Sequence, residues 1–219
     1  MKTRTALLAS IAALGAAAVP LTASLAAPAR AQAAQAAPLS AEDKALVDKA
    51  AAYLQQLDAA KGRFVQTDAR GARSEGDFWL KRPGKVRFAY DKGLLVVSDG
   101  FNVNIHDPRL KTFDRYPLSA TPLQVFLAKQ IRLDKGVKVD RVTKTADGFQ
   151  ITARDAKRPG DGSITLAFID GPNMRLKEWT VADAQGQRTR VQLTTLEPTS
   201  GLNNDLFVLR DPSRNAGRS

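Results

Sequence analysis

The stretch that decides the fold is residues 75–90, which read EGDFWLKRPGKVRFAY. Apolar and polar side chains alternate on both sides of a central Arg-Pro-Gly turn signal. In the second half, Val86, Phe88 and Tyr90 fall on one face. Alternation with a period of two predicts β-strands, and a turn this short permits only antiparallel neighbours. The stretch therefore predicts a β-hairpin with one strongly apolar face.

The same rhythm of strand and turn continues along most of the chain. Turn signals such as Asp99-Gly100 and Asp107-Pro108 separate short alternating segments. We expect strands at residues 63–68, 75–81, 85–90, 94–98, 102–107, 111–115, 137–145, 148–154, 163–169, 174–181 and 188–195, with a last short strand at 206–209. Open twisted sheets rarely stay flat beyond about ten strands. The predicted fold is therefore mainly β, an unclosed antiparallel β-barrel of about eleven strands.

Two segments change from strand spacing to helical spacing. Ser40 begins a capping box, and an apolar stripe follows until Gly62. That stripe consists of Leu46, Val47, Ala50, Leu54 and Leu57. Thr121 and Pro122 are typical of the start of a second helix. Its apolar face consists of Leu123, Phe126, Leu127 and Ile131. We expect both helices to cover the concave side of the sheet as a lid.

The N-terminal residues predict export. Lys2 and Arg4 precede a run of small and apolar residues at 6–19, and Ala29-Arg30-Ala31 matches the pattern that signal peptidases cleave. The run is shorter than the about 20 apolar residues of a spanning helix, which argues against the alternative of a retained membrane anchor. We expect the chain to divide into a cleaved signal peptide, a flexible leader and a single periplasmic domain, at residues 1–31, 32–39 and 40–219.

Composition narrows the range of functions. The chain has 33 Lys and Arg against 22 Asp and Glu, one His and no Cys. The basic excess suits an anionic membrane surface or an acidic partner, and export argues against nucleic acid. His106 is the only His for a catalytic triad, yet its place in an alternating segment indicates a surface or structural residue. The sequence also lacks a Gly-rich phosphate loop and metal-ligand clusters. We therefore expect a protein that is not an enzyme and uses no cofactor and no metal.

The expected sheet and helices carry many large apolar side chains. The candidates for lining an apolar cavity are Phe64, Phe78, Leu80, Val86, Phe88, Tyr90, Val96, Val103, Ile105, Leu123, Phe126, Leu127, Ile164, Leu166 and Phe168. Two interpretations are open from the pattern alone. In one, these residues form a core packed against the helices. In the other, the interior is larger than two helices can fill and leaves a pocket for an apolar ligand.

Between residues 64 and 122 the chain resembles the outer-membrane lipoprotein carrier family, LolA. The matching segments are FVQ at 64–66, GDFWLKRP at 76–83, VRFAY at 86–90, VSDG at 97–100, IHDP at 105–108 and TPL at 121–123. Lys-Arg-Pro followed at this spacing by Ser-Asp-Gly is the most specific feature. The order of helix, six-strand meander, Thr-Pro helix and five-strand meander extends the resemblance over nearly all of the chain after residue 31.

The resemblance implies an unclosed barrel with a helical lid, in a monomeric periplasmic chaperone. Such a protein accepts lipoproteins from an inner-membrane ATP-driven releasing complex and delivers them to an outer-membrane acceptor or to the membrane surface. The lipoprotein acyl chains are held in the apolar cavity. In the family, the Arg of Lys-Arg-Pro hydrogen-bonds to the lid, so Arg82 would be the lid latch, with an ordinary surface Arg as the alternative. The chain departs from the family at Phe88, where Trp is common.

Three other functions compete with lipoprotein transport. Proteins that share this fold sense lipid signals and control an anti-sigma factor, but they carry a second domain, which we do not expect here. A periplasmic carrier or sensor of another lipid, such as a glycolipid or a hopanoid, would differ only in its ligand. A secreted hydrolase would need a catalytic group. Spacing alone leaves paired carboxylates open, although no Asp or Glu lies in an apolar run that would raise its pKa.

Overall fold

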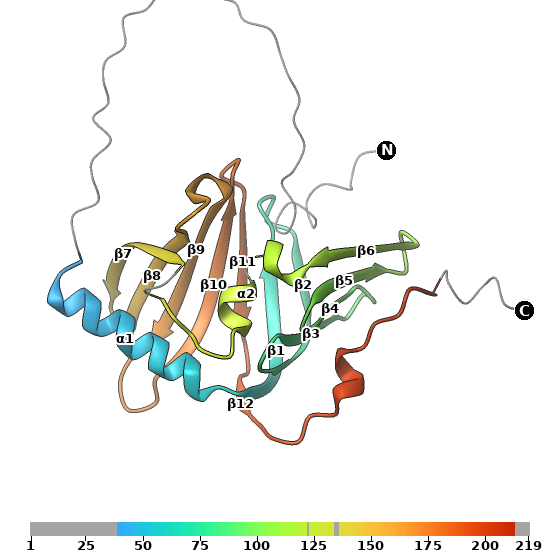
Figure 1. Cartoon of the computed structure of the whole chain (residues 1–219), viewed down its shortest axis with the longest axis horizontal. Helices are drawn as coiled ribbons and strands as arrows, with labels where there is room; N and C mark the ends of the chain where they lie inside the picture. The colour runs from blue at the N-terminus through green and yellow to red at the C-terminus, as the bar shows by residue number, and fades with distance from the viewer. Residues whose placement is uncertain (1–38, 122, 134–135, 213–219) are drawn as a thin grey trace, which may run out of the picture.

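The structure of the chain is a computed structural model, which describes residues 39–121, 123–133 and 136–212 (Figure 1). The expected signal peptide lies outside the described residues, and so does the expected leader except for Leu39. The strands are β1 (Ala59–Thr67), β2 (Arg73–Lys81), β3 (Lys85–Tyr90), β4 (Leu95–Asp99), β5 (Asn102–Asp107), β6 (Thr112–Pro117), β7 (Val137–Thr145), β8 (Gly148–Asp155), β9 (Gly162–Ile169), β10 (Arg175–Asp183), β11 (Arg188–Leu193) and β12 (Glu197–Pro198). The helices are α1 (Ala41–Gln56), α2 (Leu123–Leu127) and the short 3-10 turns η1 (Leu118–Ala120), η2 (Pro159–Asp161) and η3 (Asn204–Phe207).

All of the strands belong to one 12-stranded antiparallel sheet. Its order is β6-β5-β4-β3-β2-β1-β11-β10-β9-β8-β7, and β12 pairs with β1 beside this path. The sheet therefore consists of two meanders, β1–β6 and β7–β11, joined where β1 pairs with β11. Within the described part of the chain no ladder joins β6 to β7, and these strands lie at opposite sides of the molecule (Figure 1). The prediction of an unclosed antiparallel barrel is confirmed.

The first helix begins as predicted and ends earlier than predicted. The Oγ of Ser40 accepts a hydrogen bond of 3.0 Å from the backbone N–H of Asp43, which is the expected N-cap. The helix ends at Gln56, and β1 begins at Ala59 instead of Arg63. The physical reason is that β2 pairs with β1 along its full length, up to Lys81 opposite Ala59, so the strand extends past Gly62.

The second helix is much shorter than predicted, and Ile131 lies beyond its end. In a longer helix, the N–H of Ile131 would donate to the carbonyl of Leu127. Instead the side chain of Gln55 accepts from the N–H of Ile131 at 2.8 Å, and the N–H of Gly84 donates to the carbonyl of Leu127 at 2.7 Å. Contacts from other elements thus take both partners of the bond that would continue α2.

The helices cover one face of the sheet, and their buried side chains form two clusters with it. Val47, Ala50 and Leu54 of α1 pack on β8 and β9, together with Ile131 and Leu133 from the segment after α2. Leu118 of η1 and Leu127 of α2 pack on β3, β4 and β5. Figure 1 shows α1 crossing β7–β10 and α2 lying over the middle of the sheet. The prediction that helices cover one side of the sheet is confirmed.

The C-terminal segment covers the opposite face, where the predicted strand at 206–209 does not form. Residues 204–207 are the 3-10 turn η3, and Phe207 is 1 % exposed. The turn η3 contacts β3 and β4. Arg87 donates to the carbonyl of Leu206 at 3.2 Å, and Lys81 donates to the carbonyl of Leu202 at 2.7 Å. These basic side chains bind backbone carbonyls that a strand would have used for its ladder.

We predict that Phe149, at the centre of the cluster under α1, is essential for stability. Phe149 is 1 % exposed and stacks on Phe168 with ring centroids 5.3 Å apart. Phe149→Ala should lower the free energy of unfolding by about 3–5 kcal/mol, measured by urea denaturation. Phe101→Ala is the matched control because Phe101 is 83 % exposed, and it should change stability by less than about 0.5 kcal/mol. Equal effects of the two changes would contradict the described core.

Candidate functional site

The residues predicted to line a cavity lie together on the sheet face beneath the helices. Those that are buried are Phe64, Phe78, Val86, Val96, Val103, Ile105, Leu127, Leu166 and Phe168. Those that are partly buried and pack against them are Leu80, Phe88, Tyr90, Phe126 and Ile164. The side chain of Leu123 lies outside the described residues. The structure brings the described residues into three adjoining clusters, and a cavity for a ligand stays a prediction.

The middle of this face is an aromatic strip that neither helix contributes to. We call this band the central aromatic strip, and its five rings are Phe64, Phe78, Phe88, Tyr90 and Trp179. The ring of Phe64 makes edge contacts with Phe88 at 5.3 Å and with Tyr90 at 5.0 Å. Phe88 also lies 6.3 Å from Trp179. The strip therefore runs from β3 across β2 and β1 to β10 in the second meander, between the two helix-covered clusters.

Trp179 is the member of the strip that sequence reasoning missed. Leu176 pairs with Phe168 and Trp179 pairs with Leu166, so both point to the same face although three positions separate them. A β-bulge between Leu176 and Glu178 adds the extra residue. A strict period of two places Leu176 and Trp179 on opposite faces. The available signal was the large aromatic ring itself in an otherwise alternating strand.

Arg82 joins the sheet to both helices. Its Nε donates to the carbonyl of Phe126 in α2 at 2.9 Å, and a guanidinium NH₂ group donates to the carbonyl of Leu54 near the end of α1. Its backbone N–H donates to the carbonyl of Asp58 at 2.7 Å. The planar guanidinium suits this task because it presents several donors in a fixed fork. Sequence reasoning expected contacts nearer Thr121, and the role of Arg82 as a latch stays a prediction.

The surroundings of Arg82 are partly desolvated. Burial lowers the pKa of the Arg82 guanidinium below its ordinary value, and the nearby carboxylate of Asp58 opposes this shift. An arginine remains protonated in proteins even so, which means that a charged donor faces the two carbonyls. Hydrogen bonds from charged donors contribute more than neutral ones, about 1.5–3 kcal/mol each.

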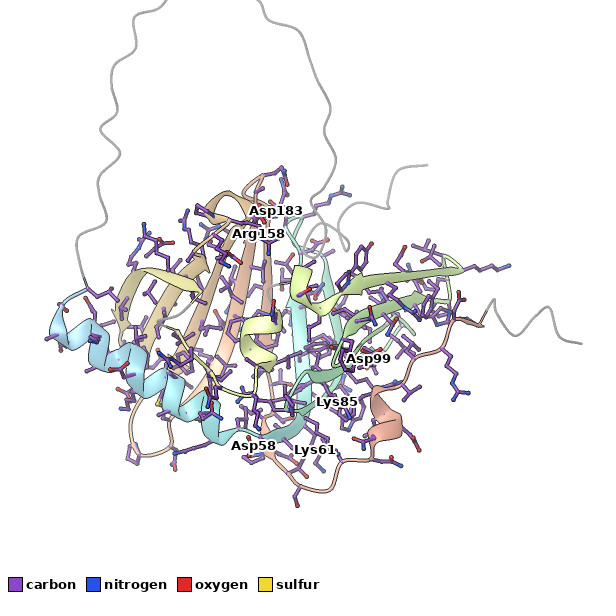
Figure 2. All side chains as sticks on the ribbon, in the orientation of Figure 1. Asp58, Lys61, Lys85, Asp99, Arg158 and Asp183 are labelled. Atoms are coloured by element: carbon purple, nitrogen blue, oxygen red, sulfur yellow. The ribbon has the colours of Figure 1, made fainter. Side chains whose placement is uncertain are left out.

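The two most specific sequence motifs meet in space beside Arg82. The turn after Arg82 and the turn at Asp99-Gly100 lie at the same end of neighbouring strands, because Lys85 pairs with Asp99 (Figure 2). A Cβ added to Gly84 would lie 2.7 Å from the Cα of Gly100, closer than any side chain allows. The buried Oγ of Ser98 donates to the carbonyl of Gly84 at 2.6 Å. Ser-Asp-Gly therefore supports the turn that positions Arg82.

Gln55 is a second fastening between α1 and the segment after α2, and sequence reasoning missed it. Its side-chain Nε2 donates to the carbonyl of Lys129 at 3.0 Å, while its Oε1 accepts from the N–H of Ile131 at 2.8 Å. One amide thus binds a backbone acceptor and a backbone donor, as a neighbouring strand would. A lone Gln at the polar side of a helix carries no sequence signal for this role.

Chemistry-bearing groups are sparse in the described ranges. Within them no group of three or more His, Cys, Asp or Glu side chains could hold a metal ion. His106 is partly exposed, and its ring lies 6.5 Å from that of Phe113. No helix among the described residues is long and apolar enough to cross a membrane.

Comparison with known proteins identifies the family. The family model described as "Outer membrane lipoprotein carrier protein LolA" matches residues 55–210. The chain belongs to the LolA family. The matched LolA region contains Gln55, Arg82, α2 and all of the strands.

Curated LolA relatives are similar over most of their length. An outer-membrane lipoprotein carrier protein of Methylibium petroleiphilum is 28% identical over 178 residues, which are 76% of this chain and 86% of the relative. The corresponding protein of Chromohalobacter salexigens is 27% identical over 177 residues, with coverage of 75% and 82%. Among solved structures, a LolA superfamily protein from Nitrosomonas europaea is 10% identical with a TM-score of 0.41, covering 74% of this chain and 97% of that one.

We predict that Arg82→Lys loosens the lid without unfolding the sheet. Lysine keeps the charge but cannot span the carbonyls of Phe126 and Leu54 with a rigid fork. The Gly84 amide, which donates to Leu127 in α2, should exchange with deuterium about ten-fold faster, because opening of the lid becomes about 1.4 kcal/mol easier. Residue-resolved exchange by NMR measures this, with Val97 in the core as the internal reference.

Arg190→Lys is the matched control for that experiment. Arg190 binds Glu178 on the exposed side of the sheet, far in sequence from the lid. Unchanged exchange at Gly84 in Arg82→Lys, or equal acceleration in both variants, would remove Arg82 from the control of the lid.

Proposed function

We propose that this LolA-family protein carries lipoproteins from the inner to the outer membrane with their acyl chains held against the central aromatic strip. The observation that carries the proposal is the strip itself, a band of rings between two helix-covered clusters, with Arg82 fastening both helices beside it. An aqueous compartment makes such a face necessary, because each exposed CH₂ group of an acyl chain costs about 0.8 kcal/mol.

The described arrangement corresponds to a closed carrier. Phe64 and Val86 are 1 % and 3 % exposed, so an acyl chain reaches the face only when the covering segments move aside. The segment from η1 to Leu133 is the natural one to move, because it belongs to no ladder of the sheet. Hydrogen bonds with Arg82, Gln55, Gly84 and Phe101 hold it, together with its buried side chains Leu118, Leu127, Ile131 and Leu133. An acyl chain of about a dozen CH₂ groups gains about 10 kcal/mol on burial, which is of the same order as the hydrogen bonds and apolar contacts that opening breaks.

Release depends on keeping the open and closed states close in free energy. A ligand shifts such an equilibrium only by its difference in affinity for the two states. Arg82 stabilises only the closed state, so it sets how strongly an acyl chain must bind to open the lid. It also lowers the free energy of the state that remains after the cargo leaves.

The proposed setting is the periplasm, with the protein acting as a monomer. Lipoproteins come from an inner-membrane ATP-driven releasing complex and pass to an outer-membrane acceptor or to the membrane surface. The protein needs no catalytic group, since the free energy for extraction comes from the donor complex and transfer is an exchange between apolar surfaces. Its relatives' names as lipoprotein carriers support this assignment.

A carrier or sensor of another lipid, such as a glycolipid or a hopanoid, is the second candidate. It is favoured by the same aromatic strip, whose rings accept any long apolar chain. Mass spectrometry of lipids and lipoproteins that co-purify with the protein distinguishes the two candidates.

We predict that the protein binds a fluorescent fatty-acyl probe and that Phe88→Asp abolishes this binding. The carboxylate would lie between Phe64 and Trp179, where desolvation of a charge opposes an acyl chain. Phe101→Asp is the matched control, since Phe101 is 83 % exposed on the turn between β4 and β5, and it should bind the probe like wild type. Fluorescence titration measures both.

The milder change Phe88→Ala keeps this test valid if Phe88→Asp does not fold, which circular dichroism reports. It should weaken binding by about ten-fold or more through lost ring contacts. A wild-type protein that ignores the probe would end the carrier proposal, and so would binding that survives both changes at Phe88.

A further inference from the structure

A pocket of about 340 Å³ lies at the end of the first meander, away from the lid fastening. It is lined by Arg73, Ser74, Glu75, Tyr90, Asp91, Lys92, Leu94, Asp107 and Arg109. These residues come from the strand ends and turns between β1 and β2, β3 and β4, and β5 and β6. Arg82 lies in the β2–β3 turn, at the opposite ends of the same strands, and Figure 1 shows the β5–β6 turn projecting at the edge of the sheet.

The floor of the pocket is continuous with the apolar face. Leu94 is 8 % exposed and belongs to the cluster under η1 and α2. Tyr90 is a member of the central aromatic strip, and its ring packs edge-on against Phe64. Its hydroxyl donates to the Oε1 of Gln66 at 2.8 Å. Tyr90 and Leu94 therefore separate the pocket from the apolar face and belong to both.

The rim of the pocket carries three cations. Arg73, Lys92 and Arg109 are exposed, and within the described residues none of their side chains makes a salt bridge or a hydrogen bond. Two of the three come from turns next to each other along the sheet edge, after β3 and after β5. Each is a long flexible side chain, so their charged groups can converge on one ligand oxyanion.

Two of the three carboxylates of the pocket are already engaged by the protein. Asp91 is bound by the guanidinium of Arg63 at 2.7 Å. The Oδ1 of Asp107 accepts the backbone N–H groups of Arg109 at 2.9 Å and Leu110 at 3.2 Å. Glu75 is the remaining acid, and it is exposed to water. Because Arg63 pairs with Asp91, the three rim cations face two carboxylates that form no ion pair within the described residues, Glu75 and Asp107, and the pocket keeps an excess of positive charge.

We propose that this pocket binds the phosphate head group of an anionic lipid, whose acyl chain passes Tyr90 onto the central aromatic strip. This inference rests on the proposed function, because it uses the same apolar face for the chain. The volume is near the lower end for small-molecule sites, about 300–1,000 Å³, so it holds a head group and leaves the chain to the face. Three cations suit a phosphate, which offers several oxygens to charge-assisted donors.

The test compares lipids with the same chains and different head groups. Isothermal titration of the protein with dioctanoyl phosphatidylglycerol should give a Kd about ten-fold or more below that for dioctanoylglycerol. The triple change Arg73→Gln, Lys92→Gln and Arg109→Gln should remove this difference and leave the affinity for dioctanoylglycerol unchanged. The matched control, Lys44→Gln, Lys138→Gln and Arg175→Gln, removes the same charge from exposed positions elsewhere and should keep the difference.

Each other outcome has a definite meaning. Equal affinities of the two lipids for wild type, or equal effects of the two triple changes, would overturn the head-group site. Inorganic phosphate that binds as tightly as the phospholipid would show a free anion site and overturn the lipid assignment. Binding of dioctanoylglycerol without any charge preference leaves the proposed carrier function intact, whereas failure of both lipids to bind would contradict the carrier function itself.

Discussion

The two meanders form a single sheet because residues 64–67 of β1 pair with residues 190–193 of β11. β1 is the strand on which both halves depend, since it also pairs with β2 and with β12. Gly62 lets the backbone of Thr195, just after β11, approach β1 closely. A Cβ at position 62 would lie 2.1 Å from the carbonyl oxygen of Thr195. The pairing places Phe64 between rings of the first half and Trp179 of the second. Without it, the central aromatic strip would not exist.

The lid is held over the sheet without the ladders that join the strands to one another. The sheet is stabilised by its ladders and by large buried side chains such as Phe149 and Phe168. The covering segment is held by directed bonds from Arg82, Gln55 and Gly84 and by its buried side chains, Leu118, Leu127, Ile131 and Leu133. Movement of the segment breaks these bonds and apolar contacts but no ladder of the sheet. We propose that the lid opens while the sheet stays folded, as a carrier of apolar chains requires.

Sequence reasoning predicted the antiparallel strands and turns well, because alternation and Asp-Gly signals are local. The turn at Asp99 is an example, where its Oδ1 accepts the N–H groups of Phe101 and Asn102. The family resemblance also predicted a contact between Arg82 and the lid, although it was expected nearer Thr121 than Phe126, where it lies. The features that were missed all depend on partners distant in sequence.

The early start of β1 depends on the length of β2, and the end of α2 depends on Gln55 and Gly84. Trp179 joined the strip through a bulge that no alternation pattern reveals. Residues 206–209, which read LFVL, were expected as a last short strand. Phe207, however, is buried on the outer face of the sheet, and long basic side chains bind the backbone nearby. Tertiary contacts therefore determine the structure of the lid and of the C-terminal segment on the outer face of the sheet.

The most direct test of the account is the distance between the lid and the sheet with and without an acyl ligand. The chain has no Cys, so a spin label attaches only at a Cys that is introduced. The double variant Gln124→Cys in α2 and Gln185→Cys in the β10–β11 turn carries one label on the lid and one on the sheet. Both native side chains are exposed. Pulsed electron paramagnetic resonance should show one short distance in the empty protein and a second, longer one after a saturating acyl ligand is added. A distance distribution that stays the same with bound ligand would contradict a lid that opens to admit acyl chains.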